Sequence, residues 1–149
     1  QLGQNNNTNK GGAAGDMGDN LAAIDLGTGR TVRSIQIGNS HSCAVLDNNT
    51  TKCWSGNSQG QLGQGDVLIR GDQANEMGDN LPTVNFGTNR TARSIFVGVS
   101  HSCVILDNGA FKCWGLNDTG QLGLGDTANR GDGANEMGDK LRSPRLGRN

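Results

Sequence analysis

Four cysteines are the residues of this 149-residue chain with the clearest capacity for chemistry. They form two pairs with equal spacing, Cys43 with Cys53 and Cys103 with Cys113. An even number of regularly spaced cysteines is typical of a disulfide framework. A disulfide that closes so short a loop stabilises a protein by roughly 2–3 kcal/mol on the loop-entropy model. The pattern predicts one disulfide per pair and an oxidising, extracellular or cell-surface location.

Two other interpretations of the cysteines stay open on the sequence. Free thiols pack in protein cores as small apolar groups. His41, Cys43 and Cys53 are also residue types that ligate zinc. That trio lacks a fourth ligand and the Cys-x-x-Cys spacing, so neither a metal nor a cofactor is predicted.

Acidic residues gather in a glycine-rich loop at Asp66, Asp72, Glu76 and Asp79. Their oxygens suit calcium, but they lack the alternating spacing of calcium-binding loops. Aspartate in such a turn more often bonds to its own backbone. Residues 70–72 also spell Arg-Gly-Asp, an adhesion tripeptide, although a Gly-Asp pair is ordinary turn chemistry. We expect these residues to shape a turn, with calcium binding and adhesion as the alternatives.

Five asparagines begin an Asn-x-Ser/Thr sequence, the acceptor for N-linked glycans: Asn6, Asn48, Asn49, Asn89 and Asn117. In an asparagine-rich chain some of these sequences arise by chance. Asn48 and Asn49 fall at the tip of an expected hairpin, and Asn89 falls in an expected turn. Glycans attach at exposed positions of this kind, so the five residues are candidate glycosylation sites.

Catalytic and nucleic-acid-binding functions find little support. The two histidines, His41 and His101, occupy the same position in two similar stretches, which favours a structural role. No nucleophile elbow, phosphate loop or acid pair in an apolar context is present. With 13 basic and 14 acidic residues the net charge is −1, whereas nucleic-acid binders usually carry a basic excess. The chain is predicted not to be an enzyme.

Each cysteine pair needs a β-hairpin to hold it. Residues 103–106 and 111–114 favour strands and flank Asp107-Asn108-Gly109, a turn sequence. A two-residue turn puts the cysteines out of step, whereas a three-residue loop pairs Cys103 with Cys113. The longer loop needs a left-handed residue at its third position, where Gly109 stands, with Asn49 as its earlier counterpart.

The hairpin recurs because the chain is repetitive. Residues 1–60 and 61–120 align without a gap and are identical at more than half of their positions, and residues 121–149 begin a third copy. Each full repeat is expected to hold short strands near 82–86 and 92–97, followed by the hairpin (22–26, 32–37 and its hairpin in the first copy). The prediction is therefore an all-β fold of four-stranded antiparallel blades, about two and a half repeats long.

Composition agrees with this fold. Only 32% of residues are hydrophobic, and 25 are glycine, which suits short strands and many turns. No long stretch shows a helical period, and no apolar run approaches the roughly 20 residues of a membrane span. No signal peptide is visible, and the chain opens inside a repeated motif, which suggests a piece of a longer secreted chain.

The repeated motif resembles the regulator-of-chromosome-condensation repeat. It runs from Gly98 through His101-Ser102-Cys103, then from Cys113-Trp114-Gly115 through Asn117 to Gly120-Gln121-Leu122-Gly123 and Gly125-Asp126. The first copy departs from it at Ser55. The resemblance implies a β-propeller, commonly seven-bladed, and the two cysteines per repeat resemble a secreted, disulfide-containing type. It also implies protein–protein binding, including nucleotide exchange and inhibition of secreted enzymes.

Two and a half blades do not close a propeller. The sequence therefore predicts either a fragment of a larger repeat array or a unit that assembles head to tail. We expect an extracellular structural or protein-interaction module, as in a cell-surface filament or large secreted protein, whose partners are further copies of the repeat. The alternative is a soluble propeller that binds a protein as an inhibitor or an exchange-type regulator.

Overall fold

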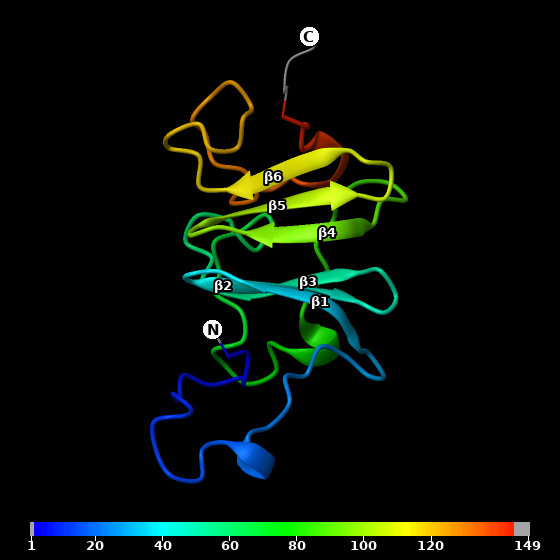
Figure 1. Cartoon of the computed structure of the whole chain (residues 1–149). Helices are drawn as coiled ribbons and strands as arrows, with labels where there is room; N and C mark the ends of the chain where they lie inside the picture. Colours follow the sequence, from blue (N-terminus) through cyan, green and yellow to red (C-terminus); the bar gives the residue numbers. More distant parts are fainter. Residues whose placement is uncertain (1, 145–149) are drawn as a thin grey trace.

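Two three-stranded antiparallel sheets form the molecule. A computed structural model of the chain describes residues 2–144 (Figure 1). The first sheet orders β1 (Val32–Ile37), β2 (His41–Leu46) and β3 (Thr51–Ser55), and the second orders β4 (Ala92–Val97), β5 (His101–Leu106) and β6 (Phe111–Gly115). Helix in the described residues is limited to three single 3-10 turns: η1 (Gly18–Asn20), η2 (Gly78–Asn80) and η3 (Gly138–Lys140). The all-β prediction is confirmed.

Both hairpins have the predicted three-residue loop. Cys103 pairs with Cys113 and Cys43 pairs with Cys53. The loop closes where the Leu106 N–H donates to the Ala110 carbonyl at 2.8 Å. Its third residue is left-handed in both copies, with φ of +81° at Gly109 and +66° at Asn49. Counting back from this bond, each cysteine pair falls at a non-hydrogen-bonded position, where opposing Cα atoms come closest.

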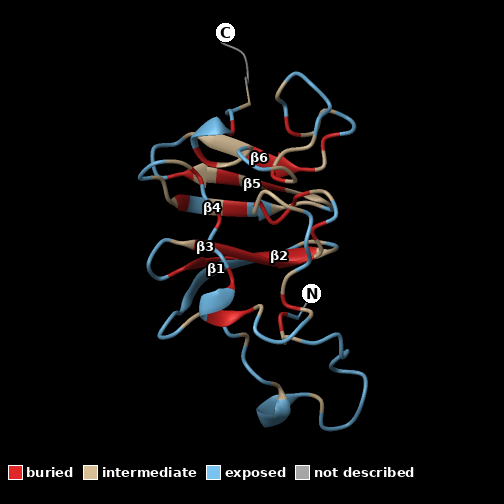
Figure 2. Cartoon of the chain, turned by 180° about the vertical axis from the view of Figure 1, so that it is seen from behind, coloured by how far each residue is buried: buried red, intermediate tan, exposed pale blue. Residues whose placement is uncertain are grey.

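The two sheets stack through opposite faces. Because successive strand residues point to opposite sides, each sheet has a cysteine face and a tryptophan face, named for neighbouring residues such as Cys53 and Trp54. The cysteine face of the β1–β3 sheet packs on the tryptophan face of the β4–β6 sheet. This inter-sheet core contains Cys43, Val45, Cys53, Leu62, Val84, Phe86, Ala92, Ile95, Val104, Leu106, Trp114 and Leu141. Figure 2 shows the resulting burial of β2.

A second core covers part of the tryptophan face of the β1–β3 sheet. It contains Leu26, Ala44, Leu46, Trp54, Met77 and Leu81. Gly3 is wedged into it, since a Cβ there would lie 2.9 Å from both the Met77 Cε and the Trp54 Nε1. Met77 therefore anchors its loop on the blade. Met17, its counterpart in the first repeat, is exposed instead.

The predicted fourth strand near 82–86 does not form as a strand. Thr83 makes one isolated bridge with Lys52, and the Val84 N–H donates to the Thr51 carbonyl at 2.8 Å. The other end of β3 is bridged by Arg70, which exchanges two backbone hydrogen bonds with Ser55. Two short segments thus share the outer edge of β3. Pro82 has no N–H to extend the pairing, and the stretch at 22–26 is likewise not a strand.

Candidate protein-interaction surfaces

All four cysteines are joined in the structure. The Cys43–Cys53 and Cys103–Cys113 pairs are disulfides, each with its Cα atoms 4.1 Å apart, and no described cysteine is free. Cys43 and Cys53 are enclosed in the inter-sheet core. Their sulfurs are therefore not available to a metal, and no group of His, Cys, Asp or Glu within residues 2–144 is placed to hold one.

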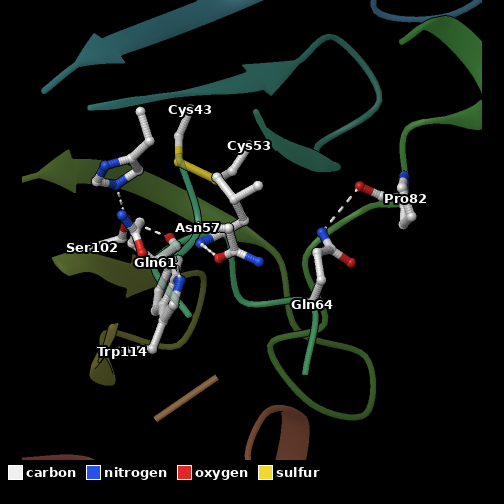
Figure 3. Close-up of a disulfide and its surroundings, with 10 residues drawn as sticks. Cys43, Cys53, Asn57, Gln61, Gln64, Pro82, Ser102 and Trp114 are labelled. Carbon is white, nitrogen blue, oxygen red and sulfur yellow. Dashed lines mark hydrogen bonds between the residues drawn. A yellow bond between two sulfur atoms is a disulfide. The ribbon is translucent and has the colours of Figure 1, made fainter. Parts of the chain in front are cut away.

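His41 links the two sheets. Its Nε2 lies 2.7 Å from the Ser102 Oγ, which donates to the Gln61 carbonyl at 3.0 Å. Trp114 Nε1 donates to the same carbonyl at 3.0 Å, and Figure 3 shows Ser102, Trp114 and Gln61 converging there. Because the Ser102 hydroxyl donates its hydrogen to Gln61, it accepts a hydrogen bond from His41. The His41 ring therefore carries its hydrogen on Nε2. The predicted structural role of this histidine is confirmed by its bond to the next blade.

This arrangement holds His41 neutral. Its side chain is fully buried, and its Nδ1 has no partner among the described residues. A second proton on the ring would therefore place an unsatisfied donor and a charge in the core. Burial, with a smaller contribution from His101, lowers the pKa of His41 to about 4. Such a group serves as a structural element, not as an acid–base catalyst near neutral pH.

Acidic side chains of the repeated loop accept hydrogen bonds from backbone N–H groups. The Glu76 Oε2 accepts N–H bonds from Gly71, Asp72 and Gln73 at 2.8, 3.1 and 3.0 Å. Burial, followed by the bond to Glu76, raises the pKa of Asp72 above its ordinary value. Asp79 accepts from the Thr28 N–H and hydroxyl at 3.0 and 2.7 Å, and these bonds lower its pKa.

These contacts explain the loop without calcium or adhesion. Arg70 of the Arg-Gly-Asp sequence pairs with Asp66, Nη2 to Oδ2 at 2.7 Å, and also donates to two backbone carbonyls. The Asp72 Oδ1 is buried. The tripeptide is therefore folded into the turn and does not present its two charges together, as the turn interpretation expects.

The candidate glycosylation sites differ in exposure. Asn6, Asn48, Asn49 and Asn89 are exposed. The Asn48 Oδ1 accepts from the Thr50 N–H and hydroxyl at 3.1 and 2.7 Å, which leaves its amide nitrogen at the surface of the hairpin tip.

Asn117 contradicts its prediction as a glycan site. Its exposure is 0%, and its Nδ2 donates to the Asp126 and Ala128 carbonyls, both at 2.9 Å. Its Oδ1 accepts from the Leu122 N–H at 3.0 Å. A glycan on Nδ2 would break this loop, so the sequence motif here is a by-product of a structural asparagine.

Sequence reasoning missed an exposed apolar loop at Val67-Leu68-Ile69. The first repeat has Asn7-Thr8-Asn9 at this place, and the third has Thr127-Ala128-Asn129. In the third copy Asn129 is tied down, accepting from the Asn117 N–H and donating to the Gln59 side chain, both at 2.9 Å. Comparing the copies position by position would have shown that the scaffold does not require apolar residues here.

A polar pocket lies beside this loop. It holds about 370 Å³ between residues 2–9 of the amino-terminal loop and residues 69–72. Ser40 lines it, and the Ser40 hydroxyl donates to the Val99 carbonyl at 3.2 Å. The lining includes several amide and hydroxyl side chains together with Leu2 and Ile69. The pocket therefore lies between the apolar loop and the turn that precedes β2.

Further apolar side chains remain exposed on the sheets themselves. They are Val32, Ile35 and Ile37 on β1 and Phe96 on β4. Monomeric proteins rarely leave contiguous apolar patches uncovered unless they bind something there. No helix in residues 2–144 has the length and apolar character to cross a membrane.

The chain is similar to known repeat proteins in both sequence and fold. The family model described as "Regulator of chromosome condensation (RCC1) repeat" matches residues 32–61 and 92–121, which are the hairpin-bearing parts of the two full repeats. Two solved structures share the fold: human WBSCR16, with a TM-score of 0.56 and 21% identity, and Prp20p from Saccharomyces cerevisiae, with 0.54 and 18%. They are matched over 68% and 72% of this chain and 25% and 26% of their own.

Two curated relatives are similar in sequence. The ultraviolet-B receptor UVR8 of Arabidopsis thaliana is 29% identical over 104 residues, 68% of this chain. A secretion-regulating guanine nucleotide exchange factor of Bos taurus is 40% identical over 77 residues, 50% of this chain. The matches span only 21% of the receptor and 14% of the exchange factor. These findings support RCC1-like repeats, folded as open, partial β-propeller blades that do not close.

Proposed function

We propose, on the premise that these are RCC1-type blades, that the chain is an extracellular structural module that binds proteins, including further blades of its own kind. The observation that carries the proposal is the pair of apolar sheet faces left without a covering sheet. The chain offers surfaces for packing and, within residues 2–144, no cluster of side chains suited to metal chemistry.

The location outside the cell rests on the disulfides. One of them is enclosed in the core between the sheets, where its sulfurs contribute to packing as well as to cross-linking. Stable disulfides are maintained in oxidising compartments and reduced in most cytosols. The four exposed asparagine sequences are compatible with the same location, where glycans are added in eukaryotic cells.

An antibody against the chain tests the location directly. Applied to intact source cells and to their medium, it is expected to label the cell surface or the secreted fraction. Mass spectrometry of that material without reduction should show no free thiol. Labelling confined to permeabilised cells, or four free thiols in native material, would overturn the proposal.

The second candidate function is regulation of a soluble partner, as in nucleotide exchange. The similarity to the exchange factor and the apolar loop Val67-Leu68-Ile69 favour it. The third repeat supplies a matched control, since Val67→Thr, Leu68→Ala and Ile69→Asn recreate its sequence. Accelerated guanine-nucleotide release from a panel of small GTPases, abolished in this triple variant, would support regulation. No acceleration across the panel would reject it.

A further inference from the structure

One exposed face is the β1 part of the tryptophan face. Val32 and Ile35 are 46% and 41% exposed, whereas their counterparts Ala92 and Ile95 on β4 are 3% and 2% exposed. The β4 residues are buried because the cysteine face of the β1–β3 sheet covers them. The face on β1 therefore has the composition of a blade-to-blade contact and, among the described residues, no sheet against it.

A loop residue shows the same difference. Leu2 is 45% exposed, and its counterpart Leu62 is fully buried in the inter-sheet core. Ile37 is also more exposed than Val97, which packs at the edge of that core. At Leu2 and along β1, positions that are buried or at the core edge in the second repeat are therefore uncovered apolar residues in the first.

The opposite end of the stack carries the complementary face. On the cysteine face of the β4–β6 sheet, Phe96 is 48% exposed, and Ile105 and Phe111 are half-buried. Their counterparts in the first sheet are Gln36, Val45 and Thr51. The uncovered copy of this face is therefore more apolar than the copy that the chain itself covers. A face that meets only water has no physical reason to differ in this direction.

We propose that these two faces bind each other between copies of the chain, head to tail. The cysteine face of the β4–β6 sheet of one copy packs on the tryptophan face of the β1–β3 sheet of the next. This partner assignment rests on the proposed function and specifies its interface. The contact repeats the one inside the chain, where a cysteine face already covers a tryptophan face.

The backbone supports the same mode of stacking. The two sheets share one register, including the irregularity between Val32 and Ser34 and between Ala92 and Ser94. Bulkier residues on both outer faces imply a somewhat wider spacing than within the chain. Because the two faces differ, the contact is heterologous, so it adds copies in one direction and yields a ring if the rotation per copy closes or an open filament if it does not.

A single polar pair marks the register of the contact. Inside the chain His41 meets Ser102 across the sheets. The equivalent pair between copies is His101 with Ser42 of the next copy. In the single chain the His101 ring lies close over Gly98 instead, so docking requires the ring to turn toward the incoming serine.

Mixing two variants tests the arrangement. Ile35→Glu blocks the tryptophan face and Phe96→Glu blocks the cysteine face, both at exposed positions where the fold tolerates a charge. Leu68→Glu is the matched control, at a still more exposed apolar residue outside both faces. Each variant is first confirmed as folded by its circular dichroism and intact disulfides, and all are then followed by analytical ultracentrifugation over a range of concentrations.

The wild-type chain and Leu68→Glu are expected to form assemblies that grow beyond dimers with concentration. Each face variant alone stays monomeric, and an equimolar mixture of the two forms dimers that do not grow, because each pair retains one matched contact. His101→Ala weakens assembly about fivefold, as expected for one lost hydrogen bond.

Three results would overturn the proposal. They are a wild-type chain that is monomeric at every concentration, a face variant that still assembles alone, and an equimolar mixture of the two face variants that forms no dimers. Its failure is distinct from failure of the proposed function. A monomeric chain found outside cells rejects only the docking, whereas an assembling chain confined inside cells rejects only the extracellular role.

Discussion

At the scale of single residues, one histidine makes the fold sensitive to acid. His41 is buried with a pKa of about 4, whereas an unfolded histidine has a pKa near 6.5. Between these values the unfolded chain binds the proton and the folded chain does not. The histidine's contribution is therefore intact above pH 6.5 and is lost as the pH falls toward 4.

We predict that the free energy of unfolding falls by about 3 kcal/mol from this group alone between pH 7 and pH 4. His41→Gln, which can still meet Ser102, should lose that part of the pH dependence. Urea denaturation at pH 7, 5.5 and 4.5 checks this, with His101→Gln as the control at the equivalent position. A pH dependence unchanged by His41→Gln would show that other groups cause it.

A second prediction concerns Asn117. Because its amide is buried and fully used, we expect no glycan there when the chain is secreted from a eukaryotic host, whatever the occupancy of Asn48. Asn117→Ala should destabilise the chain by roughly 2–4 kcal/mol, since the Leu122 N–H and two carbonyls lose their partner. Glycopeptide mapping and chemical denaturation check the two statements. Asn48→Ala, which removes an exposed residue, is the stability control.

At the scale of elements, the two disulfides are chemically alike and differently placed. The Cys43–Cys53 pair lies between two sheets, whereas Cys103 is only half-buried on an outer face. Both close loops of the same length, so the loop-entropy contribution is the same, roughly 2–3 kcal/mol each. Any difference between them must come from packing.

We therefore predict that Cys43→Ala with Cys53→Ala destabilises more than Cys103→Ala with Cys113→Ala. The first double variant leaves a cavity in the inter-sheet core, which adds to the lost cross-link. Guanidinium denaturation of the two double variants against the wild type measures the order. Equal losses, or a larger loss at 103 and 113, would contradict the role given to the core.

The register of the hairpins could be predicted from the sequence, whereas the segments that pair with the outer edge of β3 could not. Their register follows from local rules, because the loop needs a left-handed third residue and the cysteines need to be opposite each other. The stretch at 82–86 has strand-forming residues, yet the outer edge of β3 is already shared with Arg70. Which segment reaches an edge first depends on tertiary packing, which local propensity does not encode. That the repeats do not close was predicted, whereas the residues of the uncovered faces were not, since only the stacking shows which copy is covered.

At the scale of the whole molecule, the two sheets share one core. Side chains from both contribute to it, among them Val45 from β2 and Leu106 from β5. Neither sheet is therefore independent, and loss of packing in one should weaken the other.

We predict that Leu106→Ala costs roughly 2–4 kcal/mol and speeds amide hydrogen exchange in β2 as well as in β5. Residues 6–20 should exchange fast in either protein, because that loop is largely exposed. Hydrogen-exchange mass spectrometry resolves these segments. Faster exchange confined to β5 and β6 would mean that the sheets unfold separately.

The edge of β3 also has a consequence for how the chain folds during synthesis. The hairpin of the first sheet ends at Ser55, but its covering segments, Arg70 and Thr83, belong to the next repeat. The hydroxyl of Thr28 likewise donates to the carboxylate of Asp79, which also belongs to the next repeat. On the ribosome, the outer edge of a blade therefore stays unpaired until more than a third of the following repeat has emerged from the exit tunnel. A pause in translation within residues 56–83 would leave the outer edge of β3 unpaired and prone to aggregation. The rate of translation through these residues should therefore influence the fraction of chains that aggregate.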